Sequence, residues 1–331
     1  MKKQILVSGI RSTGELHLGN YYGAMQGIID LQNEYSSYFF IADLHSLTTH
    51  PKQDDFKKTV FDVARNYLSA GLDPDKSTFY AQSSIAEDIC ELHTYLSMIM
   101  PLGELMRCPT FKEKAKLHPD NVNYGLVGYP VLMAADILIH KGAIVPVGED
   151  QLVHLEIVRS IVRRFNNLFG ELFSEPLPVK ENAVRIPSLT GQGKMSKSAG
   201  SASYLTLDED NESIKNKINR AYSDPSRIYL NQAGNPTIEG CNVYHLHTFF
   251  TDYVKLEDIA IECQGAKIGC VQCKNILAES ISAIIDPIRE RRKILTNSYI
   301  HDVLLEGRKK AKESSERVIA EVRKQMGIQI F

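Results

Sequence analysis

One loop of the sequence reads Gly193-Lys194-Met195-Ser196-Lys197-Ser198-Ala199-Gly200. Its two lysines stand three residues apart between small or flexible neighbours, so both ammonium groups can reach one polyphosphate. The hydroxyls of Ser196 and Ser198 and the backbone N–H groups can bind further phosphate oxygens. Two lysines at this spacing more often belong to a solvated turn. This lysine loop (residues 193–200) becomes informative because a second motif near the N-terminus also suits a phosphate.

The second motif is Thr13-Gly14-Glu15-Leu16-His17-Leu18-Gly19-Asn20-Tyr21. It follows a short apolar strand at residues 4–8 and a loop at residues 9–14, and it begins a helix expected from about His17 to Tyr35. Unpaired N–H groups and the helix dipole both favour an anion at such a helix start. His17 and Asn20 fall about one turn apart at that end. The other interpretation is an ordinary helix start with His17 on the surface.

Strands and helices alternate through the first half of the chain. Apolar runs predict strands at residues 38–43, 77–82 and 143–147, and apolar periodicity predicts helices at residues 54–72, 87–100, 129–141 and 150–167. This order predicts an α/β fold with a doubly wound parallel sheet. A proline-rich connection at residues 171–187 is expected to end in a short strand at residues 185–187. Only helices and loops are expected from Asp208 onward, so we place a domain boundary after residue 207.

The composition limits the class of protein. The 331 residues are 43% apolar, which suits roughly two domains of about 150 residues. The net charge of −2 gives no overall basic field, so basic runs at residues 289–293 and 308–312 are the best candidates for phosphate contact. No apolar run is long enough to span a bilayer, and the N-terminus lacks the features of a signal peptide. We therefore expect a cytoplasmic protein.

The helix expected at residues 129–141 carries one carboxylate, Asp136, among apolar neighbours. Tyr129, Met133 and His140 share its face of the helix. A buried carboxylate needs a donor from the protein or from a ligand. The spacing alone favours a protein donor. An indole N–H, which can only donate, would also suit a fixed carboxylate over an apolar pocket. Hydrogen bonds from the protein's own side chains to Asp136, with no cleft before the acid, would argue against such a ligand.

Four cysteines lie in the last third of the chain. Cys241, Cys263, Cys270 and Cys273 are separated by 21, 6 and 2 residues. In a cytosolic chain, four thiols that end in a C-x-x-C pair favour a metal site over disulfides. Zinc is the general interpretation, an iron–sulfur cluster uses the same four thiolates, and unrelated reduced thiols are the third possibility.

Taken together, the two motifs resemble the HIGH and KMSKS signatures of class I aminoacyl-tRNA synthetases, and the whole chain is most similar to the bacterial tryptophanyl-tRNA synthetases. The lysine loop matches the second signature letter for letter, and His17-Leu18-Gly19-Asn20 stands for the first. The segments at residues 129–138 and 145–151 are specific for the tryptophanyl enzymes within the class. The chain departs from the family in the loop after Gly9, where Ser12 stands in place of a stiffening proline.

The resemblance implies a fold, an activity and a set of partners. It implies a Rossmann-like, HUP-type catalytic domain at residues 1–207 and an all-helical anticodon-binding domain at residues 208–331. The implied activity is that of a tryptophan–tRNA ligase. It converts L-tryptophan and ATP, with Mg²⁺, into tryptophanyl-adenylate and pyrophosphate, and then charges tRNA(Trp). The family also implies a homodimer. The four cysteines resemble those of a subgroup that holds a [4Fe–4S] cluster, with structural zinc as the alternative.

The resemblance also implies the roles of individual residues. Asp136 would accept the indole N–H of tryptophan, surrounded by Val7, Gly9, His45, Tyr129 and Met133. Catalytic contacts to phosphate would come from His17, Lys194, Lys197 and Lys114. The remaining ATP contacts would come from Arg11, Ser12, Thr13, Gly19, Asn20, Gly148, Glu149, Asp150, Gln151, Ile186, Met195, Ser196 and Ser198.

Three other functions stay open from the sequence. The nearest is a tyrosyl enzyme, which pyrophosphate exchange with each amino acid would distinguish. The second is a non-catalytic paralogue that binds RNA or tryptophan, which is disfavoured by the intact Lys194, Lys197, His17 and Asp150. The third is a small-molecule nucleotidyltransferase, which rarely needs a helical domain of this size.

Overall fold

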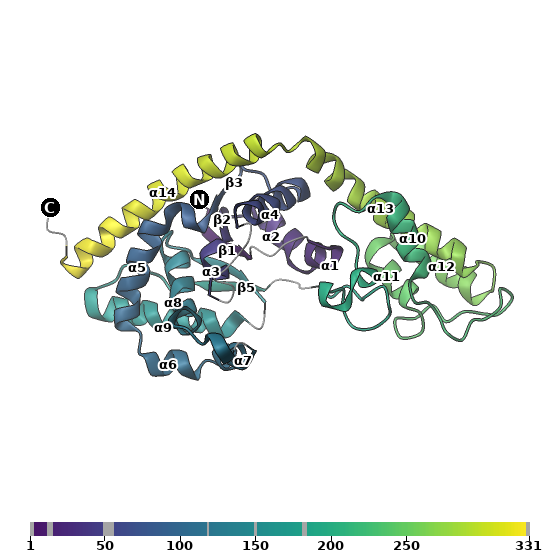
Figure 1. The fold of residues 1–331 in the computed structure, drawn as a ribbon, viewed down its shortest axis with the longest axis horizontal. Coiled ribbons are helices and arrows are strands. Elements are labelled where there is room, and N and C mark those ends of the chain that lie inside the picture. Colours follow the sequence, from purple (N-terminus) through teal and green to yellow (C-terminus); the bar gives the residue numbers. More distant parts are fainter. Residues whose placement is uncertain are drawn as a thin grey trace.

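The computed structural model of the protein describes residues 3–11, 16–48, 56–117, 119–148, 151–180 and 184–328. Its centre is a five-stranded sheet in the order β3-β2-β1-β4-β5, with every neighbouring pair parallel (Figure 1). The predicted doubly wound sheet is therefore confirmed. The order of the strands reverses between β1 and β4, and α/β sheets bind ligands at the carboxyl ends of the strands near such a point. The strands are β1 (Ile5–Arg11), β2 (Ser36–Ala42), β3 (Ser77–Ala81), β4 (Ile144–Val147) and β5 (Leu177–Lys180).

Successive residues of the central strands enter two different cores. Leu6 and Phe39 belong to the core on one face of the sheet, with residues of α2 and α4, whereas Val7 and Phe40 belong to the core with α5, α8 and α9. This alternation is the period of two that a strand buried on both faces requires. The helices concerned are α2 (Gln26–Leu31), α4 (Phe56–Ala70), α5 (Ala86–Ile99), α8 (Tyr124–Leu138) and α9 (Leu152–Phe169).

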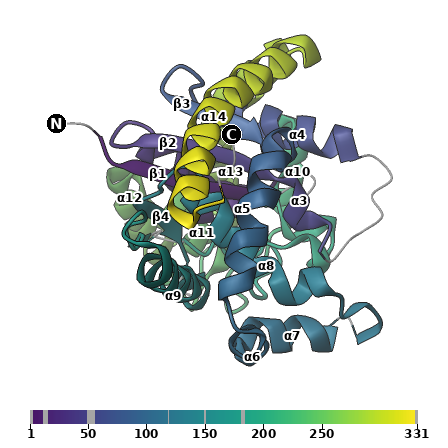
Figure 2. The same cartoon turned by 90° about the vertical axis from the view of Figure 1, so that its left-hand side faces the viewer.

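The last third of the described chain is helical, and most of it forms a second lobe (Figure 1). That lobe contains α10 (Asn211–Arg220), α11 (Asn242–Phe250), α12 (Tyr253–Gln264) and α13 (Cys270–Ile294). The final helix, α14 (Asn297–Met326), leaves the lobe and returns to the sheet, where it packs against β3 and α5 (Figures 1 and 2). The domain boundary after residue 207 stays a prediction. The helix α14 belongs in sequence to the part after that boundary, but it packs on the sheet of the part before it.

Two expected elements differ in the structure. The helix from His17 consists of α1 (Leu18–Asn20), a π-helical turn η1 (Tyr21–Met25) and α2. The proline-rich connection contains β5, an edge strand, where Pro178 is tolerated because the sheet does not need every N–H there. Residues 185–187 form no strand, and only Pro187 makes an isolated bridge, to Lys194. Among the described residues no helix combines the length and apolarity needed to cross a membrane.

Candidate active site

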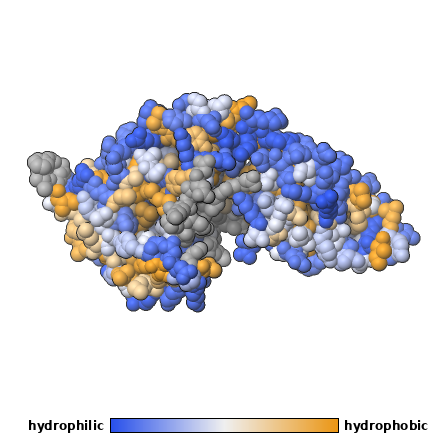
Figure 3. Space-filling model, in the orientation of Figure 1, coloured by the Kyte–Doolittle hydropathy of each residue, from blue (hydrophilic) through white to orange (hydrophobic). Residues whose placement is uncertain are grey.

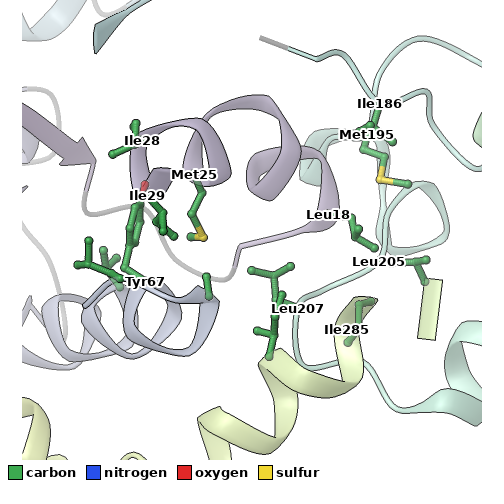
Figure 4. Packing of buried hydrophobic residues seen from close by; sticks show 14 of the residues in the cluster. Leu18, Met25, Ile28, Ile29, Tyr67, Ile186, Met195, Leu205, Leu207 and Ile285 are labelled. Carbon is green, nitrogen blue, oxygen red and sulfur yellow. The ribbon is translucent and has the colours of Figure 1, made fainter. Parts of the chain in front are cut away.

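The lysine loop packs directly on the start of α1. Met195 is buried, and it lies beside Leu18, Ile186 and Leu205 in one apolar cluster (Figure 4). A Cβ atom on Gly19 would lie 3.1 Å from the Cβ of Met195 and 3.0 Å from the His17 ring. A glycine at this position therefore gives the loop room to approach the helix. The two motifs, almost 180 residues apart in sequence, form one site.

Backbone hydrogen bonds hold the two motifs together. The N–H of Leu18 donates to Leu205 O at 2.9 Å, and the N–H of Leu207 donates to Leu16 O at 3.2 Å. His17 and Thr206 form an antiparallel bridge between these bonds. The lysine loop is held at its other end, where the N–H of Met195 donates to Ile186 O at 2.9 Å. The segment after the loop is therefore paired with the start of α1.

His17 caps α1 and is buried, which excludes the surface interpretation. Its Nδ1 accepts a hydrogen bond from the N–H of Asn20 at 3.2 Å, and its own N–H donates to Asn20 Oδ1 at 3.1 Å. Burial, followed by the charges of Lys197 and Lys194, lowers the pKa of His17 to about 4. The imidazole is therefore neutral at pH 7. Because Nδ1 accepts, the proton resides on Nε2, which can donate to an oxygen of a ligand.

A buried serine fixes the lysine loop internally. Ser203 is fully buried, and its hydroxyl donates to the carbonyls of Ser196 and Gly200, both at 2.7 Å. The hydroxyls of Ser196 and Ser198 are hydrogen-bonded to each other at 2.7 Å. Lys194 and Lys197 are exposed. The loop thus has a fixed backbone and two ammonium groups that remain accessible to a ligand beside His17.

Asp136 has two donors from the protein, as its spacing favoured. Its Oδ2 accepts from His45 Nε2 at 2.8 Å, and its Oδ1 accepts from Gln82 Nε2 at 2.7 Å. The acid is 2% exposed. A carboxylate has about four acceptor positions, so two donors leave capacity for a third hydrogen bond. Sequence reasoning missed Gln82, and its one signal was its place directly after β3, at the end of a strand where α/β sheets place ligands.

Tyr129 lies on the same helix as Asp136, α8, and takes part in a second polar cluster. Its hydroxyl is hydrogen-bonded to His154 Nε2 at 2.6 Å and to Thr110 Oγ1 at 2.8 Å. Lys114, predicted to contact phosphate, places its Nζ 3.7 Å from the centre of the Tyr129 ring. The structure thus brings Lys114 to a residue predicted to bind tryptophan. Among the other residues predicted to bind tryptophan, Val7 is buried and Met133 packs against the same core.

Several predicted site residues sit at the carboxyl ends of the central strands. Gly9 lies in β1 under the Phe40 ring, where a Cβ atom would be 2.8 Å away. Gly148 directly follows β4, and its carbonyl accepts from the N–H of Gln151 at 3.0 Å. Arg11 is described only as the last residue of β1. Ser12, Thr13, Glu149 and Asp150 lie outside the described residues.

The four cysteines approach one another in the helical lobe. Burial, followed by the charges of Cys241, Cys263 and Cys270, raises the pKa of the Cys273 thiol to about 12. Two donors face the sulfurs: His247 Nε2 lies 3.4 Å from Cys273 Sγ, and Arg227 Nη1 lies 3.6 Å from Cys263 Sγ. In the part of the chain that the structure describes, no three His, Cys, Asp or Glu side chains are arranged to hold a metal ion. The metal assignment therefore stays a prediction.

The basic runs serve mainly as internal ties. Arg291 Nε donates to Ser69 O at 2.6 Å, which joins α13 to α4, and Arg289 Nη1 donates to Glu209 O at 2.6 Å. In α14, Arg308 Nε donates to Ser84 O at 3.1 Å and Lys312 Nζ to Asp88 Oδ1 at 2.9 Å. These side chains bind other parts of the chain, so they are weaker candidates for phosphate contact than their sequence indicates.

Comparison with known proteins agrees with this geometry. A model of the family described as tRNA synthetases class I (W and Y) matches residues 1–286. The tryptophan–tRNA ligase of Porphyromonas gingivalis is 41% identical, over 98% of this chain and 99% of its own. That of Thermotoga maritima is 40% identical, with the same coverage. A structure of tryptophanyl-tRNA synthetase from Campylobacter jejuni, complexed with ADP and tryptophan, is 30% identical and covers 98% of this chain and 100% of its own, with a TM-score of 0.88. The chain therefore belongs to the class I tRNA synthetases for tryptophan and tyrosine, and among them to the bacterial tryptophanyl-tRNA synthetases.

Proposed function

We propose that this chain activates L-tryptophan with ATP and transfers it to tRNA(Trp). The observation that carries the proposal is the lysine loop, packed through Met195 on the helix start that His17 caps. This arrangement offers two ammonium groups and a neutral imidazole donor to one polyphosphate. The relatives named above are tryptophan–tRNA ligases, and one of them has been solved with ADP and tryptophan.

The reaction has two steps. A carboxylate oxygen of tryptophan attacks the α-phosphorus of ATP, the bond from that phosphorus to the bridging oxygen breaks, and pyrophosphate leaves. A terminal ribose hydroxyl of the tRNA then attacks the acyl carbon, AMP leaves with the electron pair of the acyl–oxygen bond, and the hydroxyl proton passes to the phosphate of the departing AMP. Such chemistry depends on placement and on charge stabilisation. Mg²⁺ would arrive with the ATP phosphates rather than in a site of its own.

The chain's own residues would stabilise the departing pyrophosphate. Lys194 and Lys197 neutralise its charge, and His17 donates a hydrogen bond from Nε2 without accepting a proton. A neutral histidine is sufficient for this role. The attacking carboxylate of tryptophan is already deprotonated, so the step requires no general base. The other ATP contacts named from the sequence, including Gly19, Asn20 and Gly148, belong to the same proposal.

Asp136 would select tryptophan. The indole N–H would occupy a remaining acceptor position of its Oδ2, next to the bond from His45. Val7, Gly9, Tyr129 and Met133 would surround the ring. A site built to accept a specific N–H strongly rejects an analogue that lacks it, because the buried acceptor then loses a partner.

Pyrophosphate exchange with each amino acid tests this function. We expect exchange of label into ATP with tryptophan and, at most, weak exchange with tyrosine. Asp136→Ala should weaken selection of tryptophan far more than binding of ATP, and equal losses would contradict the role of Asp136. Exchange with tyrosine alone would identify a tyrosyl enzyme, and no exchange with any amino acid would identify a non-catalytic paralogue.

We further propose that the four cysteines hold a [4Fe–4S] cluster, with structural zinc as the alternative. Four thiolates in one another's field repel each other, and a metal centre bound to all four would relieve that repulsion. Arg227 and His247 lie against two of the sulfurs and would donate hydrogen bonds to the thiolates. A cluster here would crosslink the loops of the helical lobe. Protein purified without oxygen should be brown and should contain iron and sulfide, whereas colourless protein with only zinc would refute the cluster.

We also propose that the protein is cytoplasmic and that residues 208–331 form the anticodon-binding domain.

We further propose that the protein is a homodimer. Exposed apolar side chains lie at the junction of α5 and α6 (Leu102–Arg107), where Met98 is 74% and Leu102 57% exposed, and Figure 3 shows apolar surface over the position of α6. A second copy would cover them. Light scattering should give twice the mass of one chain, and Leu102→Glu should lower it to one chain. An unchanged mass would refute this interface.

A further inference from the structure

Gln82 is a fully buried polar side chain between two candidate tryptophan-binding residues. It is 0% exposed and lies in the short helix η2 (Gln82–Ile85), directly after β3. Its Nε2 donates to Asp136 Oδ1 at 2.7 Å, and its Oε1 accepts from the N–H of His45 at 3.3 Å. The carboxamide can face only one way, because reversal would set its oxygen against the carboxylate and its NH₂ against an N–H group.

The backbone that carries Gln82 is fixed from two sides. Ser83 donates from its N–H to Asp43 Oδ1 at 2.9 Å and from its hydroxyl to Oδ2 at 2.5 Å. Asp43 begins α3 (Asp43–Ser46), the same short helix that carries His45. From the opposite side, Arg308 of α14 donates to Ser84 O at 3.1 Å. A rigid backbone on both sides lets the carboxamide hold its partners in one geometry.

We propose that Gln82 is a positioning residue that determines specificity for the indole N–H. The proposal rests on the function above, in which Asp136 accepts that N–H. Rotation of a carboxylate about its last bond is broad and roughly two-fold, so Asp136 alone has no single orientation. The bond from Gln82 fixes Oδ1, and this places the remaining acceptor positions of Oδ2 toward the ligand. Without that bond, the buried carboxylate turns to share His45, and its Oδ2 is less available to tryptophan.

The test compares tryptophan with an analogue in which sulfur replaces the indole N–H, β-(benzothiophen-3-yl)alanine. The measurement is kcat/KM in pyrophosphate exchange for each amino acid. The intact enzyme should prefer tryptophan strongly. In Gln82→Met, which keeps the length but removes both hydrogen-bonding groups, we expect this preference to fall by about 10- to 100-fold, in line with loss of one hydrogen bond to a charged group. The KM for ATP should stay within about twofold.

Gln32→Met is the matched control. Gln32 is also buried and also uses both ends of its amide, donating to Gly71 O at 3.1 Å and accepting from the N–H of Asp73 at 2.8 Å. It joins other parts of the chain, so its replacement can lower stability but should leave the preference for tryptophan unchanged. A fall of the same size in both variants would show a general loss of structure and would overturn the proposal.

Two further variants separate the possible failures. Asp136→Ala should abolish the preference; if it does not, the proposed role of Asp136 is wrong, and the role of Gln82 with it. If Asp136→Ala abolishes the preference but Gln82→Met retains it, only the positioning role is wrong. Should Gln82→Met fail to fold, Gln82→Asn keeps an amide but is one methylene shorter, so it cannot hold the 2.7 Å bond to Oδ1. It should lower the preference like the methionine, and an unchanged preference would refute the proposal.

Discussion

The contact between α14 and β3 makes a strong prediction for Gly307→Ala. Gly307 lies where α14 crosses the edge strand, and a Cβ atom there would lie only 1.8 Å from Phe79 O and 2.5 Å from Phe79 C. Phe79 is 1% exposed and is paired with Phe39 of the neighbouring strand β2, so this backbone cannot rotate away. The substitution must therefore push α14 outward.

The size of the effect follows from this geometry. Contacts under 3.0 Å are essentially unknown for real Cβ atoms, so the helix must withdraw by at least 1.2 Å from a starting distance of 1.8 Å. Overpacking typically costs about 1–3 kcal/mol. The added Cβ atom would clash with backbone atoms of Phe79, which cannot move as a flexible side chain can, so we expect a cost at the upper end of this range. Alanine returns up to about 1 kcal/mol through its higher helix propensity. We expect the free energy of unfolding to fall by about 2 kcal/mol.

Urea unfolding followed by circular dichroism measures this change. Gly27→Ala and Gly103→Ala are matched controls, because both glycines lie in helices and an added Cβ would meet nothing within 4 Å. They should leave stability unchanged or raise it by up to about 1 kcal/mol. Because α14 also holds Ser84, Gly307→Ala should raise the KM for tryptophan more than that for ATP. A variant as stable as the parent would refute the packing argument.

Three further predictions concern pH, the half-buried Glu209 and the buried Ser203. Burial lowers the pKa of His17 to about 4, of His140 to about 3 and of His247 to about 4. As the pH falls, these histidines therefore take up protons in the unfolded chain before they do so in the folded chain, and the free energy of unfolding should fall as pH drops from about 6.5 to 4. A urea midpoint that stays constant over that range would contradict this. The Glu209 carboxylate accepts from the N–H of Thr206 at 3.1 Å and from Lys217 at 2.8 Å, and Thr206 bridges His17. Glu209→Gln should therefore lower the rate of pyrophosphate exchange by about tenfold, whereas the exposed Glu212→Gln should not, and equal rates in both variants would contradict the coupling. Ser203→Ala should lower stability by about 1 kcal/mol and raise the KM for ATP, because two carbonyls of the lysine loop lose their donor; the exposed Ser201→Ala is the control, and an unchanged KM for ATP would argue against the role of Ser203.

The sequence by itself determined the class of fold and the pairing of the two phosphate motifs. Strand and helix signals are local, because a strand buried on both faces must be apolar throughout and a helix must repeat its apolar positions each turn. The strands β1 to β4 were found in this way. Motif resemblance joined His17 to Lys194 and Lys197, and the burial of Met195 against Leu18 agrees with it.

Only the tertiary structure decided which polar groups meet. Gln82 and Asp136 are 54 residues apart, and no periodicity connects them. The strand β5 was hidden by Pro178, which is permitted because the strand lies at the edge of the sheet. Arg289 and Arg291 looked like free basic residues until α13 was placed beside α4 and Glu209. The physical reason is the same in each case: a hydrogen bond is specified by two groups in space, and the chain pattern around either group alone carries no information about its partner.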